Sequence, residues 1–87
     1  MLYKEIDSFL LDAIKALLEE NGYFTQNTVA DFYKRQKKFF KENQYIKQLP
    51  AIMQMLELKR VKASKELKEK YNILFSGYPY LYIKQGD

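Results

Sequence analysis

The most regular alternation of hydrophobic and polar residues lies near the N-terminus. Seven apolar side chains recur there at steps of three and four residues, which places them on one face of an α-helix. They are Ile6, Phe9, Leu10, Ala13, Ile14, Leu17 and Leu18. The opposite face is polar and mostly acidic. Asn21 and Gly22 predict the end of this helix, because glycine readily takes the left-handed conformation that closes one.

A second helix is predicted over residues 27–42, after a short extended segment at residues 23–24. Thr25 or Asn27 is suited to cap its start, because either side chain can accept a hydrogen bond from the first turn. One face is apolar and largely aromatic, which predicts core packing. It holds Val29, Phe32, Tyr33, Phe39 and Phe40. The other face is basic and holds Lys34, Arg35, Lys37, Lys38 and Lys41.

Asn43 is predicted to separate this helix from a third one, whose inner face is again apolar. That face holds Tyr45, Ile46, Leu49, Ile52, Met53 and Leu56. Proline is tolerated in the first turn of a helix but disrupts its interior, so Pro50 predicts that the regular helix begins near Gln48. Residues 44–47 would then form a looser turn. A single kinked helix from Gln44 is the alternative.

Beyond the third helix, the chain changes to a basic stretch with features of a strand. Residues 58–63 alternate imperfectly and place Val61 and Ala63 between cations, which predicts a strand with a basic outer face. Residues 64–72 are rich in charge. They form either a short helix capped by Ser64 or a long loop.

The last part of the chain contains two further strand candidates. Residues 73–75 are a short candidate, and residues 76–79 contain the glycine and proline of a turn. Residues 80–84 alternate, with Leu81 and Ile83 apolar between more polar neighbours. This alternation predicts a half-buried final strand.

Length and composition narrow the classes of protein. Eighty-seven residues form one domain, and the pattern predicts an α+β fold that is mainly α. Cysteine and histidine are absent, which removes disulfides, thiol nucleophiles, zinc-finger ligands and the commonest general base. No glycine-rich phosphate loop or nucleophile–base set is visible. We therefore expect no enzyme, no metal, no cofactor and no small-molecule site.

The sequence also predicts a cytoplasmic protein with no membrane partner. No stretch approaches the ~18 consecutive apolar residues of a membrane span. The first apolar run is interrupted by Asp12 and Lys15, which is not typical of a secretory segment.

Charge is distributed unevenly around a net value of +4. Residues 1–24 carry two lysines against five acids, whereas residues 25–50 carry six basic residues against two acids. Residues 51–70 carry six basic residues against three acids. The middle of the chain is therefore basic, which indicates a polyanionic partner, since lysine and arginine release counterions when they neutralise phosphates.

The order of these elements resembles a winged helix-turn-helix domain. The segment LPAIMQMLELKRVKAS is similar to the end of a recognition helix that leads into the first wing strand, and GYFTQNTVADFY is similar to the short first strand and second helix. The resemblance covers about residues 5–84. It implies a three-helix winged-helix domain over residues 1–87, with a small C-terminal antiparallel β-hairpin wing. Two departures leave a helical bundle with a small hairpin as the alternative: Glu57 stands where many winged helices have glycine, and the second helix is long.

The resemblance further implies double-stranded DNA binding by a small transcriptional regulator. Its third helix would read bases in the major groove through Gln44, Lys47, Gln48 and Gln54. Phosphate contacts would come from Lys34, Arg35, Lys38, Lys41, Lys59, Arg60, Lys62, Lys65, Lys68 and Lys70. Lys47 is the one cation on the outward face of that helix, so backbone contacts should dominate over base reading.

The main alternative is a protein-interaction module, such as a small viral or plasmid inhibitor or an assembly subunit. Its interface candidates are Met55, Tyr78, Tyr80 and Tyr82, which would suit a protein partner or a second copy of the chain. A two-fold homodimer would predict a palindromic DNA site. RNA or single-stranded nucleic acid is a further alternative.

Overall fold

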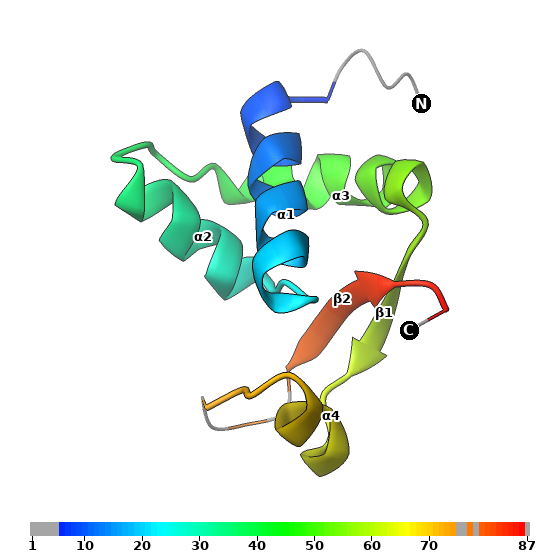
Figure 1. The fold of residues 1–87 in the computed structure, drawn as a ribbon. Coiled ribbons are helices and arrows are strands. Elements are labelled where there is room, and N and C mark those ends of the chain that lie inside the picture. Colours follow the sequence, from blue (N-terminus) through cyan, green and yellow to red (C-terminus); the bar gives the residue numbers. More distant parts are fainter. Residues whose placement is uncertain (1–5, 75–76, 78, 87) are drawn as a thin grey trace.

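The computed structural model of the protein describes residues 6–74, 77 and 79–86 (Figure 1). Within them the chain forms four helices and one two-stranded antiparallel sheet. The elements are α1 (Ser8–Asn21), α2 (Gln26–Arg35), α3 (Glu42–Leu56), β1 (Leu58–Lys62), α4 (Lys65–Lys70) and β2 (Tyr80–Lys84). The fold is therefore α+β and mainly helical, as predicted, and is consistent with a small winged-helix-like domain. In Figure 1, α1 crosses α3, α2 lies beside α1, and the sheet lies below the helices with α4 at its far end.

Helix α1 confirms its predicted pattern and end. Asp7 caps its start, because one carboxylate oxygen accepts hydrogen bonds from the backbone N–H groups of Phe9 at 2.8 Å and Leu10 at 3.2 Å. Gly22 ends the helix in the left-handed conformation at φ 83°, and its N–H donates to the carbonyl of Leu18. The apolar face of α1 is buried in the main core.

Helix α2 begins as predicted but ends earlier. Thr25 and Thr28 form a reciprocal capping box, each hydroxyl accepting the other residue's backbone N–H. The helix stops at Arg35, so the prediction of a helix to residue 42 is wrong. Lys37 adopts a left-handed φ of 57°, and the N–H of Lys38 reaches back to the carbonyl of Tyr33, which closes the helix.

The early end of α2 has two consequences. It spreads five like charges over a helix end and a loop, where they repel one another less than along a single helix. The end of α2 at Arg35 also leaves the rings of Phe39 and Phe40 in different environments. Phe40 packs on Tyr33 and Tyr45, whereas Phe39 is 81% exposed, so its predicted place in the core is wrong.

Helix α3 is continuous from Glu42, which corrects two predictions. Asn43 lies inside the helix and does not separate it from α2, and the helix begins well before Gln48. The alternative of a single helix through Pro50 is closer to the structure. Pro50 has no N–H to donate to the Ile46 carbonyl, and both residues are exposed, so the helix continues through proline on its solvent-facing side.

The two strands, which we call the wing, pair antiparallel with Arg60 opposite Tyr82 and Lys62 opposite Tyr80. Ser64 caps α4, so residues 64–72 contain the helix rather than only a loop. Ile73 and Leu74 are not in a strand, which contradicts that part of the prediction for residues 73–75.

The remainder of that prediction, and part of the predicted turn, concern Phe75, Ser76 and Tyr78, which lie outside the described residues. The backbone N–H of Ile73 instead bonds the carbonyl of Lys68 and closes α4, with Asn72 left-handed at φ 58°.

Phe24 joins the helices to the wing. Its N–H and carbonyl both pair with Tyr82, at 3.1 and 3.0 Å, so the predicted extended segment becomes a one-residue bridge to β2. The two rings stack with centroids 5.0 Å apart. Phe24 is fully buried in the helical core, while the other face of the wing packs a second core that contains Leu81 and Ile83.

Glu57 supplies a test of the junction between α3 and β1. It is the one residue between the two elements and is left-handed, at φ 54° and ψ 58°. We expect Glu57→Gly to raise the free energy of unfolding by about 1 kcal/mol, because glycine takes this conformation without a Cβ clash. Urea denaturation measures the change. Lys15→Gly, at an exposed position inside α1, is the matched control and should lower stability by about 1 kcal/mol. A destabilised Glu57→Gly variant would show that the side chain, and not the backbone, holds this turn.

Candidate nucleic-acid interface

One face of α3 is solvent-exposed and largely polar. Its exposed side chains recur at helical spacing, and we call them the outer face of α3. They are Glu42, Asn43, Ile46, Lys47, Pro50 and Gln54. The inner face is buried in the main core, where Tyr45, Leu49 and Ile52 pack. A face of this kind is available to a partner, whereas the inner face is not.

Two of the four predicted base-reading residues lie elsewhere. The Gln48 Oε1 atom accepts the backbone N–H of Asp7 at 2.8 Å, and the Gln44 amide donates to the Asp7 carboxylate at 3.4 Å. Both side chains therefore hold the start of α1. Lys47 and Gln54 are exposed on the outer face.

The sequence pattern missed Asn43 and Ile46 as members of this face. The pattern predicts Asn43 at a helix boundary and Ile46 in the core, because isoleucine is apolar, and both predictions are wrong. A helix that begins at Glu42 places Asn43 one turn before Lys47 and Ile46 one turn before Pro50. Asn43 and Ile46 therefore belong to the outer face.

The outer face of α3 meets the wing across a groove of about 480 Å³. The groove is lined by Gln26, Tyr45, Ile46, Leu49, Pro50, Met53, Arg60 and Tyr82. The Arg60 guanidinium lies 4.5 Å from the centroid of the Tyr80 ring, a cation–π contact that orients it. Arg60 and Lys62 share one face of the sheet, because side chains two residues apart point the same way. The structure thus brings part of the α3 face and the basic face of the wing to one site.

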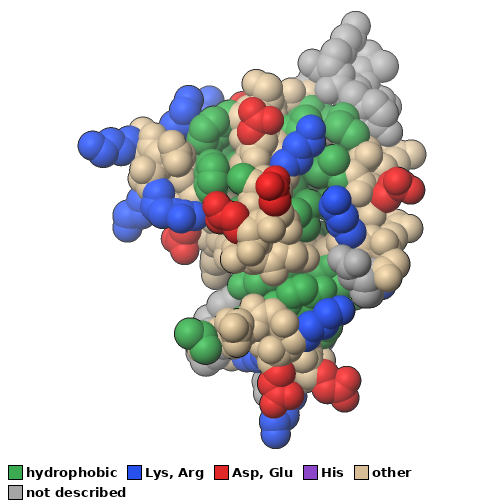
Figure 2. All heavy atoms as spheres, viewed as in Figure 1, with side chains coloured by type: hydrophobic (Ala, Val, Ile, Leu, Met, Phe, Trp, Pro, Cys, Tyr) green, Lys and Arg blue, Asp and Glu red, His purple; other side chains and the backbone are tan. Residues whose placement is uncertain are grey.

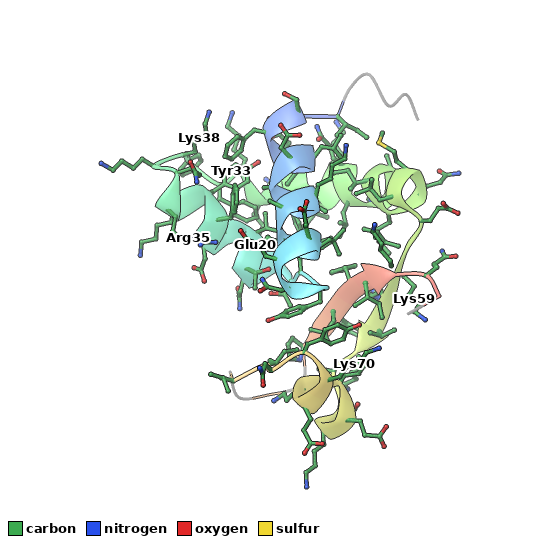
Figure 3. All side chains as sticks on the ribbon, in the orientation of Figure 1. Glu20, Tyr33, Arg35, Lys38, Lys59 and Lys70 are labelled. Atoms are coloured by element: carbon green, nitrogen blue, oxygen red, sulfur yellow. The ribbon has the colours of Figure 1, made fainter. Side chains whose placement is uncertain are left out.

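The other predicted phosphate-contact residues are spread over the molecule. Figure 3 shows Arg35 and Lys38 near the end of α2, with Lys59 and Lys70 on the wing side. Lys34 and Arg35 line a pocket with Leu17 of α1, and are not among the residues that line the α3–wing groove.

Three of these cations have different surroundings. The Lys38 ammonium lies 4.7 Å from the Phe9 ring centroid, near the start of α1. Lys41 is exposed just before α3. Lys59 is half-buried in β1. In Figure 2 basic side chains gather at the α2 edge, while acidic ones lie over α1.

The cations of α4 are interspersed with acids. Lys65 and Lys70 are exposed and Lys68 is half-buried, while Glu66 and Glu69 occupy the same short helix. This mixture gives α4 a weaker positive field than β1 has.

The four predicted protein-interface residues do not share one environment. The Tyr82 ring stacks on Phe24. Tyr80 is 50% exposed, and the Arg60 guanidinium lies over its ring. Met55 is half-buried, and Tyr78 lies outside the described residues.

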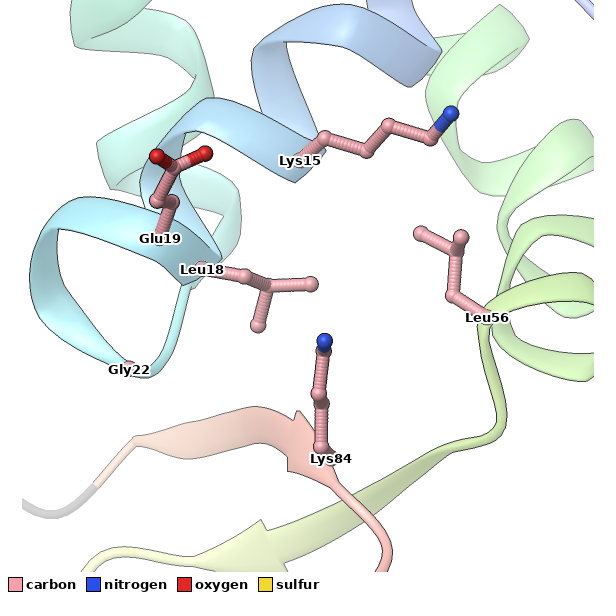
Figure 4. Close-up of a pocket in the computed structure, with 6 residues that line it drawn as sticks. All are labelled: Lys15, Leu18, Glu19, Gly22, Leu56 and Lys84. Carbon is pink, nitrogen blue, oxygen red and sulfur yellow. The ribbon is translucent and has the colours of Figure 1, made fainter.

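A second hollow of about 400 Å³ lies between α1, α3 and β2 (Figure 4). Leu18 and Leu56 form its apolar walls, and the Lys84 side chain points between them. Lys15 and Glu19 stand at its α1 side. Its charges have both signs, so its field is less positive than that of the basic face of the wing.

Comparison with known proteins adds no relative. The chain matches no protein-family model, no curated protein and no solved structure. Among the described residues, no cluster of three or more acidic, histidine or cysteine side chains is placed to hold a metal ion. No helix in the described part of the chain is long and apolar enough to cross a membrane.

The floor of the α3–wing groove contains a buried tyrosine. The Tyr45 hydroxyl has no hydrogen-bond partner among the described residues. Burial raises the pKa of this hydroxyl, and the neighbouring Tyr82 raises it further. Burial and the negative Asp7 likewise raise the pKa of Tyr33 to about 12.

These pKa shifts predict alkaline unfolding. A tyrosine in the unfolded chain loses its proton near pH 10, whereas these two hold theirs when folded, so stability falls as the pH rises above about 10. We expect Tyr45→Phe to be at least as stable as wild type at pH 7, because it removes a buried hydroxyl without a partner. The variant should also lose stability less steeply at alkaline pH. Urea denaturation at about pH 7, 9 and 11 measures both, and an alkaline slope equal to that of wild type would contradict the prediction.

The neighbouring residues Lys47 and Gln48 test the two faces of α3. We expect Gln48→Ala to lower the free energy of unfolding by about 1 kcal/mol, because it leaves the Asp7 N–H without its amide partner. Lys47→Ala, its matched control, should change stability by less than about 0.5 kcal/mol, because the side chain is exposed. Thermal or urea unfolding measures both variants. Equal losses would show that Gln48 does not hold α1 in this way.

Proposed function

We propose that the protein binds double-stranded DNA, with α3 in the major groove and the wing against the adjacent backbone. The observation that carries the proposal is the shared groove, to which α3 contributes Ile46 and Pro50 and β1 contributes Arg60. An exposed helix and a basic strand pair thus adjoin at one site, which is the arrangement needed to contact two neighbouring parts of a duplex. The proposed role is that of a small regulator of transcription.

The dimensions of α3 support this mode of binding. The major groove of B-DNA is about 12 Å wide and admits one α-helix. The fifteen residues of α3 span about 22 Å at the rise of an ideal helix. Asn43 and Lys47 lie in its N-terminal half, which is the part of a recognition helix that contacts base edges.

The wing supports the proposal through its charge. One sugar-phosphate strand separates the major groove from the adjacent minor groove. With α3 in the major groove, the wing would lie against that strand. Arg60 and Lys62 share the sheet face that adjoins the α3–wing groove, where they can neutralise phosphates. The cations at the end of α2 would extend the contact to a second stretch of backbone.

The balance of charge and polarity favours modest sequence preference. The outer face of α3 contains one cation, Lys47, one acid, Glu42, and two amide side chains, Asn43 and Gln54. Phosphate contacts position a protein without reading sequence, whereas base contacts discriminate. Most of the affinity would therefore be electrostatic and would weaken steeply with added salt.

A single charge reversal tests the assignment of the wing. We expect Arg60→Glu to weaken binding to a random-sequence 20-base-pair duplex by about tenfold or more, and to make binding less dependent on salt. Lys15→Glu is the matched control, because it changes the net charge equally but lies on α1, away from the α3–wing groove. Fluorescence anisotropy at several salt concentrations measures both, and circular dichroism confirms that each variant is folded.

Two outcomes would overturn the proposal. Equal losses for Arg60→Glu and Lys15→Glu would show that net charge, and not the wing, drives binding. If the wild-type protein does not bind duplex DNA even at low salt, DNA binding itself is excluded. Affinity capture of a protein partner would then test the alternative interface around Tyr80.

A further inference from the structure

Ile46 stands out on the outer face of α3, because it is apolar and 54% exposed. Leu49 and Ile52 on the same helix are buried. An isolated exposed aliphatic residue is ordinary on a protein surface, so exposure alone assigns no role. The position of Ile46 is more informative. It lies one turn from Asn43 and one turn from Pro50, in the middle of the surface proposed to face DNA bases.

The chemistry of the major groove limits what an aliphatic side chain can recognise there. The base edges display hydrogen-bond donors and acceptors and one apolar group, the C5-methyl of thymine. An aliphatic side chain placed against a donor or acceptor would displace its water without replacing the hydrogen bond. Placed against a methyl group, it buries apolar surface on both partners.

We propose that Ile46 reads the C5-methyl group of thymine, an inference that rests on the proposed DNA binding. The branched side chain suits this role, because in a helix it is held largely in one rotamer and so presents a fixed apolar surface. Pro50 extends that surface by one turn. Asn43, one turn before Ile46, can pair with the N6 and N7 atoms of adenine. Together they give the protein a preference for sites that contain neighbouring A·T pairs.

Uracil-substituted DNA tests this inference directly. Deoxyuridine keeps the Watson–Crick pairing of thymidine but lacks the C5-methyl group. Two barcoded libraries of random 20-base-pair duplexes, one with thymine and one with uracil, compete for wild-type protein at low salt, and sequencing counts the retained molecules. We expect bound thymine duplexes to be favoured by about fourfold for each methyl group contacted. Ile46→Ala should bind both libraries equally.

Leu74→Ala is the matched control. Leu74 is also an exposed aliphatic residue, at 95% exposure, but it lies after α4 and is not among the residues that line the α3–wing groove. This variant should keep the wild-type preference for thymine. Ile46→Ala should unfold as wild type does in urea, because the residue is exposed and alanine favours helix.

The outcomes separate this inference from the proposed function. Equal retention of both libraries by wild type would overturn the thymine inference and leave DNA binding intact. A preference for thymine that survives in Ile46→Ala would overturn the assignment to Ile46. If wild type retains neither library, the proposed function fails and this inference fails with it.

Discussion

The contact between Phe24 and Tyr82 is the constraint on which the arrangement of this protein depends. Phe24 is fully buried among the helices, while its backbone pairs with β2 and its ring stacks on Tyr82. Tyr82 in turn lines the α3–wing groove. One pair of residues therefore fixes the wing against the helical core and forms part of the proposed site. A wing held only by its own strands would be marginally stable, because a two-stranded sheet buries little surface by itself.

The link between α3 and β1 adds a second constraint on the same groove. Glu57 is the single residue between them, so the rotation of α3 about its axis and the direction of β1 cannot vary independently. The chain after β2 reinforces this junction: the Gln85 N–H bonds the Glu57 carbonyl, and the Gln85 amide bonds the Leu58 carbonyl. Ile46 and Arg60 are thereby held in a fixed relation, although they lie on different elements. A preformed surface loses less conformational entropy on binding than a flexible one.

Local pattern predicted much of the fold, but not the boundaries around the basic loop. The periodic face of α1, the alternation in β2 and the caps at Thr25 and Ser64 are encoded in adjacent residues, and the structure confirms them. The end of α2 depends on Lys37 in a conformation usually marked by glycine, and α3 starts without a side-chain cap. The candidate site is predicted only in part, because contacts between residues far apart in sequence also position its side chains. Gln44 and Gln48 face α1 because they bond Asp7, about forty residues away in sequence, and helical periodicity alone contains no information on that contact.

The separation of charge from the outer face of α3 has a consequence for the proposed mechanism. Cations flank this helix in the loop before it and on the strand after it, and Lys47 is the one cation on its outer face. Phosphate affinity and base discrimination would then depend on different elements, with the flanks binding any duplex and α3 distinguishing among sequences. Discrimination by an aliphatic side chain involves no charge, so it would persist at salt concentrations that weaken the phosphate contacts. A protein built in this way gains relative sequence preference from contacts that salt does not screen, even as its total affinity falls.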